Sequence, residues 1–512
     1  MPQLTQAEGP RLAPELTARG GVATSASSSS RVAWLAFAAV FAFALRMLYL
    51  SHESVSGDEA FSMSVSQLPL KEMLAALVQD FVHPPLHYFV LRGWFKLFGF
   101  GLFQARLLSV IFGTLAVVFL YLLAEYLFDR RTALLSALLM SVSQLAIMYS
   151  QEARPYAQFH FLALLSCYLF ARAMREGRPG YWWGFVGSAI LMLYTDYFSV
   201  YLIVALLLLA AIYRQSSRLR LWWVLTGAAL TIGFYLPWVT SGILHAAANS
   251  GKTFMGTSPW AAVRLQTFVS ALNFFDNGKP VGLRSDSPWW TYLVGGILFG
   301  APLLWLLWKA MTGRLADDRQ DREGLVTTAI LWLLPMFLTL GVGRALHIPY
   351  NVRYVSFCAA FYYLLVARAI LELPISALRW GLVALIIVYS ANSLRANYLM
   401  RWKEYWDDAF AYVQQNRQQG DCGVFLPDFE EPPQWPITQA GRPSFRVLPK
   451  DSVAAELPEC SRVWEVSWAP RDDFRWLLEH EAKNTVLQTT YQKIDEQHYF
   501  GVRVALYSRK EQ

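Results

Sequence analysis

The chain has 512 residues, of which 55% are hydrophobic and only 16% are charged. A soluble globular protein is nearer a quarter charged, so the composition argues against an ordinary soluble protein and favours a membrane protein. The net charge of +7 could indicate nucleic acid, but the basic residues fall between apolar runs, as they do in the cytoplasmic loops of membrane proteins. We therefore expect membrane lipids, and no nucleic acid, among the partners.

The first thirty residues are polar and end in the run Ser27–Ser30. Such a segment cannot bury a core, so residues 1–31 are predicted to form a disordered cytoplasmic N-terminus. The apolar segment that follows is long enough to span a membrane and shows no clear small-residue cleavage site. It is predicted to remain as a signal anchor.

Eleven segments are predicted to span the membrane, since a spanning helix needs about 20 mostly apolar residues. They are 32–50, 105–128, 132–149, 155–174, 181–197, 198–213, 221–241, 288–308, 325–343, 353–371 and 380–397. The shorter stretch 85–98 contains Arg92 and Lys96, and its length favours an interfacial or re-entrant helix.

The positive-inside rule supports this assignment, because it leaves most basic clusters in cytoplasmic loops. The predicted membrane domain is 32–397. Its outer face carries the first outer loop 51–104, the 150–156 turn, Asp196, the loops 242–287 and 344–353, and everything after about residue 398.

Residues 398–512 change in character. Short apolar patches at Gly423–Leu426, Arg462–Val466 and Val502–Tyr507 alternate with polar and Pro-rich segments. We expect a small non-cytoplasmic α/β or α+β domain, large enough for its own core. The predicted fold class is therefore an all-α polytopic membrane bundle with a small soluble C-terminal domain. A disulfide between Cys422 and Cys460 depends on an oxidising compartment and stays open at this point.

The first outer loop opens with Ser56-Gly57-Asp58-Glu59. Two adjacent acids directly after a spanning helix would lie near the headgroup level, where a carboxylate could act as general base toward an acceptor hydroxyl or amine. A solvated interfacial turn explains the same pattern, and the spacing alone does not decide between the two.

His83-Pro84-Pro85 follows in the same loop. The prolines break the chain and start the short helix, so His83 would project near the N-terminus of that helix. A structural histidine is the commoner case. The chain has no H-E-x-x-H motif and no metal-spaced set of ligands, so no cofactor is expected and a divalent metal, although possible, is not indicated.

The turn Tyr149–Tyr156 places Glu152 and Arg154 between two apolar runs. Charges at a membrane boundary often line a polar cavity. Arg154 could bind a phosphate with its planar guanidinium or could simply pair with Glu152. Asp196 is a further boundary acid, or an ordinary loop residue.

The last cluster lies between the ninth and tenth predicted spans. It comprises Arg344, His347, Tyr350, Asn351, Arg353 and Tyr354. Two outer arginines run against the positive-inside trend, which favours an anionic ligand such as a lipid phosphate. Headgroup anchoring is the alternative interpretation.

These motifs, in this order, resemble glycosyltransferase family 39 of the GT-C group. This family includes protein O-mannosyltransferases and the bacterial enzyme that adds aminoarabinose to lipid A. The resemblance rests on Gly57-Asp58-Glu59, His83-Pro84-Pro85, Arg106-Leu107-Leu108-Ser109 leading into Gly113, Tyr149–Tyr156 and Arg353-Tyr354. It is clearest over about 50–200 and thinner up to about 400.

The resemblance implies a GT-C bundle, a polyprenyl-phosphate sugar donor and inversion at the anomeric carbon. It implies that Asp58 is the general base, with Glu59 beside it, and that Glu152 is the second acid. The predicted substrate or donor-binding residues are His83, Arg154, Tyr156, Arg344, Arg353 and Tyr354, of which the resemblance implies His83 and Arg353. Pro84 stands where the lipid A enzymes have a lysine, so the phosphate contact would rest on Arg154, Arg344 or Arg353.

The leading hypothesis is an inverting membrane glycosyltransferase whose acceptor is a lipid, a polysaccharide or a protein. Its expected location is the bacterial inner membrane, with the active site facing the periplasm. A transporter or flippase of lipid-linked sugars is the alternative, although transporters place ionisable residues near the bilayer midplane. A non-catalytic scaffold is the third hypothesis.

Overall fold

The structure is a computed structural model of the whole chain. It describes residues 23–80, 82–215, 217–218, 221–243, 265–278, 289–314, 319–345, 351–401, 403–426, 446–447, 460–468 and 490–510. Most of the predicted N-terminal segment 1–31 lies outside these residues.

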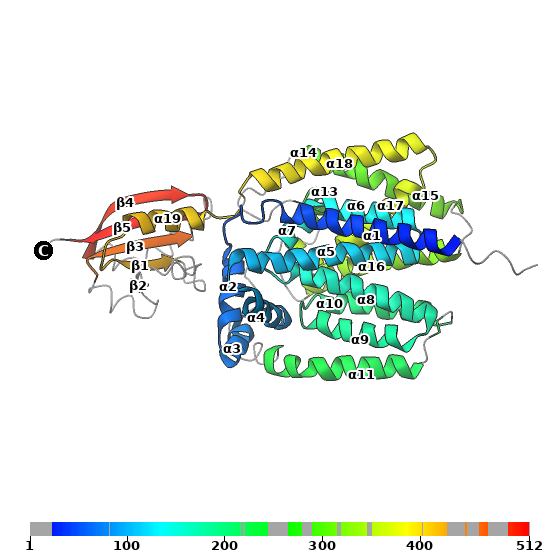
Figure 1. Ribbon diagram of the computed structural model, residues 1–512, viewed down its shortest axis with the longest axis horizontal. Helices are drawn as coiled ribbons and strands as arrows, with labels where there is room; N and C mark the ends of the chain where they lie inside the picture. Colours follow the sequence, from blue (N-terminus) through cyan, green and yellow to red (C-terminus); the bar gives the residue numbers. More distant parts are fainter. Residues whose placement is uncertain are drawn as a thin grey trace, which may run out of the picture.

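A bundle of long helices forms most of the molecule (Figure 1). Its helices are α1 (Ala23–Met47), α5 (Leu102–Leu127), α6 (Arg130–Val142), α7 (Gln144–Ser150), α8 (Tyr156–Glu176), α9 (Pro179–Leu193), α10 (Ser199–Ile212), α11 (Leu221–Trp238), α13 (Leu265–Asn277), α14 (Trp289–Gly295), α15 (Ala301–Met311), α16 (Arg319–Ala345), α17 (Cys358–Leu371) and α18 (Ser376–Leu399). Short π-helical turns, η1 (Val239–Ile243) and η2 (Gly296–Gly300), follow α11 and α14.

Each of the eleven predicted spans coincides with a helix or with a closely linked helix pair. Among the described residues, seven helices are long and apolar enough to cross a membrane, or eight if α6 and α7 form one bent span. Helices α10 and α17 are apolar but shorter, with 14 residues each. The integral membrane character is therefore confirmed, while the count of eleven stays a prediction.

Three segments differ from the prediction in detail. Helix α1 begins at Ala23, so residues 23–31 are helical instead of disordered, because an established helix extends readily into Ala- and Ser-containing sequence. The predicted span 132–149 bends by 64° at Ser143. Ser143 caps α7 through the backbone N–H of Ala146 and shares a hydrogen bond with the Tyr363 hydroxyl, 2.7 Å away.

The predicted outer loop 242–287 contains helix α13, which packs against α7, α14 and α18. Its apolar face carries Phe274 and Phe275, both buried in the core. Asp276 lies at its end and accepts a hydrogen bond from the Tyr362 hydroxyl at 2.8 Å. This apolar face explains why the segment enters the bundle.

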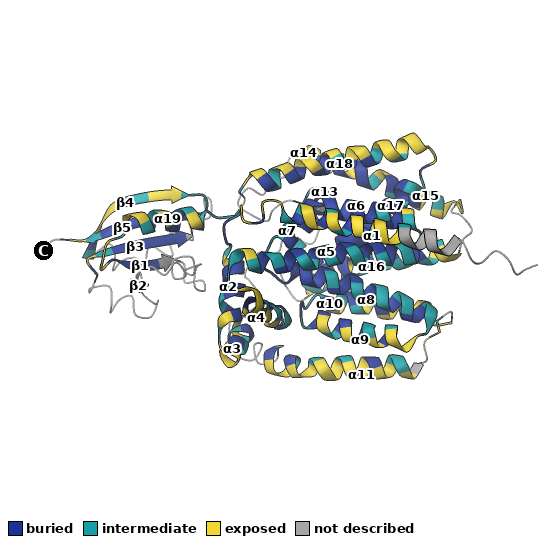
Figure 2. Ribbon diagram, viewed as in Figure 1, coloured by how far each residue is buried: buried dark blue, intermediate teal, exposed yellow. Residues whose placement is uncertain are grey.

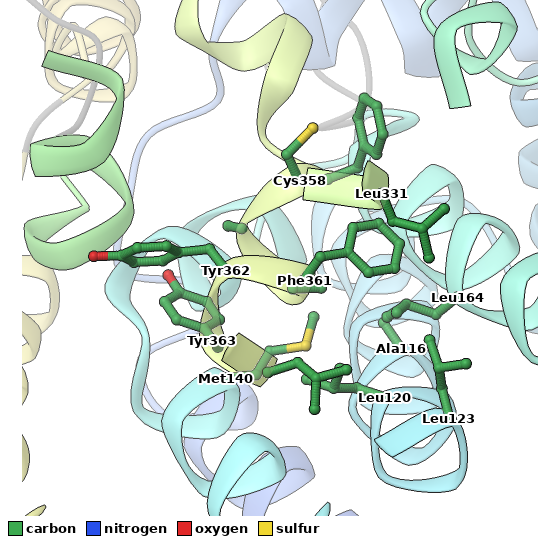
Figure 3. Close-up of a cluster of buried hydrophobic side chains, with 14 of the residues drawn as sticks. Ala116, Leu120, Leu123, Met140, Leu164, Leu331, Cys358, Phe361, Tyr362 and Tyr363 are labelled. Carbon is green, nitrogen blue, oxygen red and sulfur yellow. The ribbon is translucent and has the colours of Figure 1, made fainter. Parts of the chain in front are cut away.

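The centre of the bundle is apolar and lies between α5, α6, α8, α16 and α17. Figure 3 shows aliphatic side chains of α5 meeting Met140 of α6 and Phe361 of α17. The outer helices α11 and α18 expose much of their apolar surface (Figure 2), as lipid-facing helices do.

Three short helices lie together at one end of the bundle (Figure 1). They are α2 (Gly57–Gln67), α3 (Leu70–Asp80) and α4 (Leu86–Phe98). Helix α4 packs on α2 and α5 and is not among the candidate spans, in agreement with the prediction for 85–98.

The C-terminal domain lies beyond the same end of the bundle (Figure 1). It contains α19 (Trp406–Asn416) and the strands β1 (Cys422–Leu426), β2 (Arg446–Val447), β3 (Arg462–Trp468), β4 (Tyr491–Tyr499) and β5 (Val502–Arg509). The sheet order is β2-β1-β3-β5-β4, parallel from β2 to β3 and antiparallel from β3 to β4. All three predicted apolar patches are strands, and the predicted fold class is confirmed.

Two clusters hold this domain together. Trp406, Phe410 and Val413 of α19 pack against Trp464 and neighbouring apolar residues of the sheet. Cys422 and Cys460, whose pairing the sequence leaves open, form a disulfide within a second cluster.

A close approach of α5 and α7 depends on Gly113. A Cβ atom at this position would lie 2.0 Å from Ser150 Oγ, which receives a hydrogen bond from Arg46. We expect Gly113→Ala to lower the free energy of unfolding by about 1–3 kcal/mol, because overpacking forces neighbours to shift. Thermal unfolding in detergent would measure the change.

Gly93→Ala in α4 is the matched control. Nothing lies within 4 Å of its Cβ position, so alanine should be neutral or slightly stabilising there. Equal melting temperatures for the two variants would contradict the importance of the α5–α7 contact.

Candidate active site

The site lies at the end of the bundle where α2, the α7–α8 turn and the connector after α18 meet. Ser56 caps α2: its hydroxyl accepts a hydrogen bond from the Glu59 backbone, and the Glu59 side chain accepts one from the Ser56 backbone. Asp58 and Glu59 therefore occupy the first helical turn, where acidic residues are favoured by the helix dipole.

Glu59 is completely buried, and its carboxylate accepts six hydrogen bonds. The donors are Arg106 Nε and Nη2 at 2.9 Å each, Lys403 Nζ at 2.8 Å, the Ala153 N–H at 3.0 Å, and the N–H and hydroxyl of Ser56 at 3.1 and 3.3 Å. Burial alone would raise the pKa of Glu59, but Arg106 and Lys403 outweigh it and hold the pKa well below the usual value. The geometry favours a positioning role for this acid.

Arg106, near the start of α5, is the main partner of Glu59. It makes five hydrogen bonds: two to the Glu59 carboxylate and three to the backbone carbonyls of Leu50, Glu53 and Ser54. The guanidinium thus joins the end of the first outer segment to α2. Sequence reasoning included Arg106 only as part of a motif, although an arginine inside a span is itself a signal of function.

Lys403 was not predicted at all. Its ammonium lies 2.8 Å from Glu59 Oε2 and 3.5 Å from Glu152 Oε1. The side chain of Glu152 is 21% exposed, and this ion pair places it at the edge of the Glu59 cluster. Glu152 thus pairs with Lys403, whereas a local pair with Arg154 is the alternative interpretation that the sequence left open.

Asp58 has the open carboxylate of the site. Its side chain is 55% exposed, and its Oδ2 lies 3.3 Å from Arg353 Nη1. The positive charge of Arg154, and then that of Arg353, holds the pKa of Asp58 below its usual value. The carboxylate is therefore ionised and accessible.

Two arginines flank Asp58. Arg154 is buried and donates through Nη1 to the Asp58 carbonyl at 3.0 Å and to Ser62 Oγ at 3.1 Å. Arg353 lies in the short 3₁₀ helix η3 (Val352–Val355) and also donates to the Tyr156 hydroxyl at 3.4 Å. Arg154, Arg353 and Tyr156 thus lie close together around Asp58.

The buried histidines lie beside this group. His83 Nδ1 is 3.8 Å from Asp196 Oδ2, and the His83 ring meets Tyr156 edge to face. His87 Nδ1 lies 3.2 Å from Gln158 Oε1. Burial lowers the pKa of His83 well below its usual value and lowers the pKa of His87 to about 4, so both imidazoles are neutral.

Asp196 is also buried, between α9 and α10. Burial raises the pKa of its carboxyl group to about 7. Four further polar atoms of the site are buried without a hydrogen-bond partner among the described residues. They are Arg154 Nε, His83 Nε2, His87 Nε2 and the Tyr88 hydroxyl. These atoms are unusual because buried polar groups are normally paired.

The remaining predicted site residues either make other contacts or lie outside the part of the chain that the structure describes. Tyr354 stacks on Phe198, with ring centroids 4.3 Å apart, so its ring is held by an aromatic contact. Arg344 lies in the last turn of α16, but its side chain is outside the described part of the structure, and so are His347 and Tyr350. Within the described part of the chain, no group of three or more His, Cys, Asp or Glu side chains could hold a metal ion.

Comparison with known proteins extends this picture. Residues 82–240 match the family described as dolichyl-phosphate-mannose-protein mannosyltransferase. A stretch of 151 residues is 28% identical to an uncharacterised protein of Aquifex aeolicus (strain VF5), and it covers 28% of this chain and 30% of that protein. The match therefore spans less than a third of that relative.

Two solved structures share the fold over nearly the whole chain. ArnT from Cupriavidus metallidurans, bound to undecaprenyl phosphate, has a TM-score of 0.58 at 12% identity and covers 94% of this chain and 98% of its own. The Archaeoglobus fulgidus oligosaccharyltransferase, tethered with an acceptor peptide, has a TM-score of 0.50 at 13% identity, with coverage of 94% and 74%.

Residues 82–240 thus match a glycosyltransferase family, and nearly the whole chain shares its fold with ArnT and the archaeal oligosaccharyltransferase. The resemblance predicted from the sequence is confirmed for residues 82–240, and the predicted fold is confirmed for nearly the whole chain. The donor, the acceptor and the roles of the site residues remain predictions.

The Glu59 cluster generates a stability prediction. Glu59→Gln removes the negative charge that compensates Arg106, and an uncompensated buried charge costs about 3–5 kcal/mol. We expect a clear fall of the melting temperature in detergent. Asp58→Asn is the control, because Asp58 directly precedes Glu59 but has an exposed side chain, and it should melt like the wild type. Equal melting temperatures for the wild type and both variants would contradict the contribution of the buried Glu59 carboxylate to stability.

Proposed function

We propose that this protein transfers a sugar from a polyprenyl-phosphate-linked donor to a lipid, polysaccharide or protein acceptor, with Asp58 as general base. The acceptor hydroxyl would give its proton to Asp58 while its oxygen attacks the anomeric carbon. The bond from that carbon to the phosphate oxygen would break, and polyprenyl phosphate would leave. A single displacement of this kind inverts the anomeric configuration.

The open carboxylate of Asp58 carries the proposal. Of Asp58, Glu59 and Glu152, Glu59 has both oxygens occupied by donors, and Glu152 is paired with Lys403. Asp58 alone of the three is more than half exposed, and one arginine contacts its carboxylate. A base must be within reach of the proton that it accepts, and the exposure of the Asp58 carboxylate supports its assignment as the base.

The arginines supply the positive charge that the leaving phosphate needs. Arg353 is partly exposed and lies at the Asp58 carboxylate, and Arg154 lies beneath it with its Nε free of protein partners among the described residues. Preorganised guanidinium groups stabilise negative charge that develops during the reaction. His83 and His87 are buried, and their Nε2 atoms have no hydrogen-bond partner among the described residues, so they could donate or accept hydrogen bonds to the sugar.

The location of the charges favours transfer over transport. Asp58 lies in α2, and Arg154 and Arg353 contact it. Helices α2 to α4 lie together at one end of the bundle (Figure 1). A transporter would need ionisable residues nearer the bilayer midplane. ArnT and the archaeal oligosaccharyltransferase, which share the fold, are themselves associated in their structures with undecaprenyl phosphate and with an acceptor peptide, respectively.

We further propose that the site faces the periplasm of a bacterial inner membrane. The disulfide between Cys422 and Cys460 lies in the domain at the site end of the bundle. Disulfides persist in oxidising compartments, so this end is expected to face away from the cytosol.

The base assignment predicts the effect of Asp58→Asn. Asparagine keeps the shape but cannot accept the proton, so transfer should fall by about 10²–10⁴-fold. The measurement is transfer of radiolabelled sugar from polyprenyl-phosphate donors by purified protein. Glu72→Gln, an exposed acid on α3 in the same loop, should keep full activity; full activity of Asp58→Asn would exclude Asp58 as the base.

Because the charges of Arg154 and Arg353 lower the pKa of Asp58, we expect a specific pH dependence of kcat/KM. The base works when ionised, so kcat/KM should be full above the lowered pKa of Asp58 and fall only below it. Arg353→Met removes one cause of the lowering, and the acid limb of the kcat/KM profile should move to higher pH. Arg379→Met, at the opposite end of the bundle, should leave the limb in place. An unmoved limb in Arg353→Met would show that Arg353 does not act on the base.

A further inference from the structure

The connector between the membrane bundle and the C-terminal domain passes through the candidate active site. Helix α18 ends at Leu399 and α19 begins at Trp406, so only residues 400–405 join the two parts. Trp402 lies outside the described residues. A connector this short transmits any displacement of the domain directly to its own residues.

Lys403 fixes the middle of this connector to the site. Its ammonium binds Glu59 and Glu152, and its backbone N–H donates to Glu53 Oε2 at 3.2 Å. Its side chain is only 16% exposed, so the ion pairs are screened little by solvent. Burial opposes the charge, but Glu59 and then Glu152 outweigh it and raise the pKa of Lys403.

Both ends of the connector are anchored as well. On the bundle side, the Tyr398 hydroxyl donates to the Leu45 carbonyl at 2.6 Å. On the domain side, the Tyr405 N–H donates to the Phe500 carbonyl at 3.0 Å, and Arg401 pairs with Asp408 at 2.8 Å. The connector is therefore held by hydrogen bonds or ion pairs to both the membrane bundle and the C-terminal domain.

The charge balance of the site depends on Lys403. Glu59 and Glu152 bring two negative charges into the cluster, and among the described residues of the bundle Arg106 is the one cationic side chain that pairs with Glu59. Without Lys403, Glu152 would lose its ion pair, and Glu59 would lose one of its donors. Glu59 also binds the Ala153 N–H, so the turn that carries Arg154 would lose part of its support.

We propose that Lys403 is a positioning residue that couples the placement of the C-terminal domain to the geometry of Asp58 and Arg154. This inference rests on the proposed glycosyl transfer at Asp58. Lys403 acts through Glu59 and Glu152 and does not itself touch the donor. A macromolecular or lipid acceptor held by the C-terminal domain would thereby influence the same turn that positions the base.

The first test compares Lys403→Met with Lys403→Arg in the full-length protein. Methionine keeps most of the length of the side chain without the charge, so kcat should fall by about tenfold to a hundredfold, as expected for a misplaced site. The donor KM should stay near the wild-type value, and arginine should restore most of kcat. Unchanged kcat in Lys403→Met, or no rescue by arginine, would overturn the positioning role.

Lys493→Met is the matched control. Lys493 lies on β4 in the same domain, is 46% exposed and pairs with Glu496 at 2.6 Å. It should keep wild-type activity. A loss equal to that of Lys403→Met would assign the effect to the domain in general and overturn the specific role of Lys403.

The second test needs no activity. Spin labels at Leu70→Cys on α3 and Ile494→Cys on β4, both exposed, would report the distance between the bundle end and the domain. The distribution should be narrow in the wild type and in Lys403→Arg, and clearly broader in Lys403→Met. An unchanged distribution in Lys403→Met would overturn the coupling. If the wild type transferred no sugar at all, the proposed function would fail while this test still decided the coupling.

Discussion

The buried ion pair between Glu59 and Arg106 is the interaction on which the site end of the molecule depends. Charges removed from water are stable only when paired and fully hydrogen-bonded, and here the pair satisfies both conditions. The pair joins four parts of the chain: the segment before α2, the start of α5, the α7–α8 turn at Ala153, and Lys403. Four segments distant in sequence are thereby held in a fixed relation.

The same pair explains why two adjacent acids differ in role. Successive residues of a helix point about 100° apart, so Glu59 can face Arg106 while Asp58 faces the open side. The inward acid is saturated by donors, and the outward acid keeps an accessible carboxylate between Arg154 and Arg353. A site with one fixed acid and one free acid suits a reaction that needs a single base.

The sequence predicts the parts of this structure that follow from local pattern. Apolar length locates the helices, and their alternation with basic loops correctly assigns the Asp58 loop, the Arg154 turn and Arg353 to one end. The roles of Arg106 and Lys403 were not predictable, because their partner Glu59 lies 47 and 344 residues away. The bend at Ser143 likewise depends on a tertiary contact, with Tyr363.

Sugar transfer by the purified wild-type protein tests the proposed chemistry most directly. A panel of polyprenyl-phosphate donors with a labelled sugar would be offered together with membrane lipid extract, and the anomeric configuration of the product would be determined. We predict that label moves from the lipid donor to an acceptor with inversion. If no donor is consumed while labelled lipid crosses the bilayer of liposomes containing the protein, the glycosyltransferase proposal is contradicted and the chain is a transporter of lipid-linked sugars.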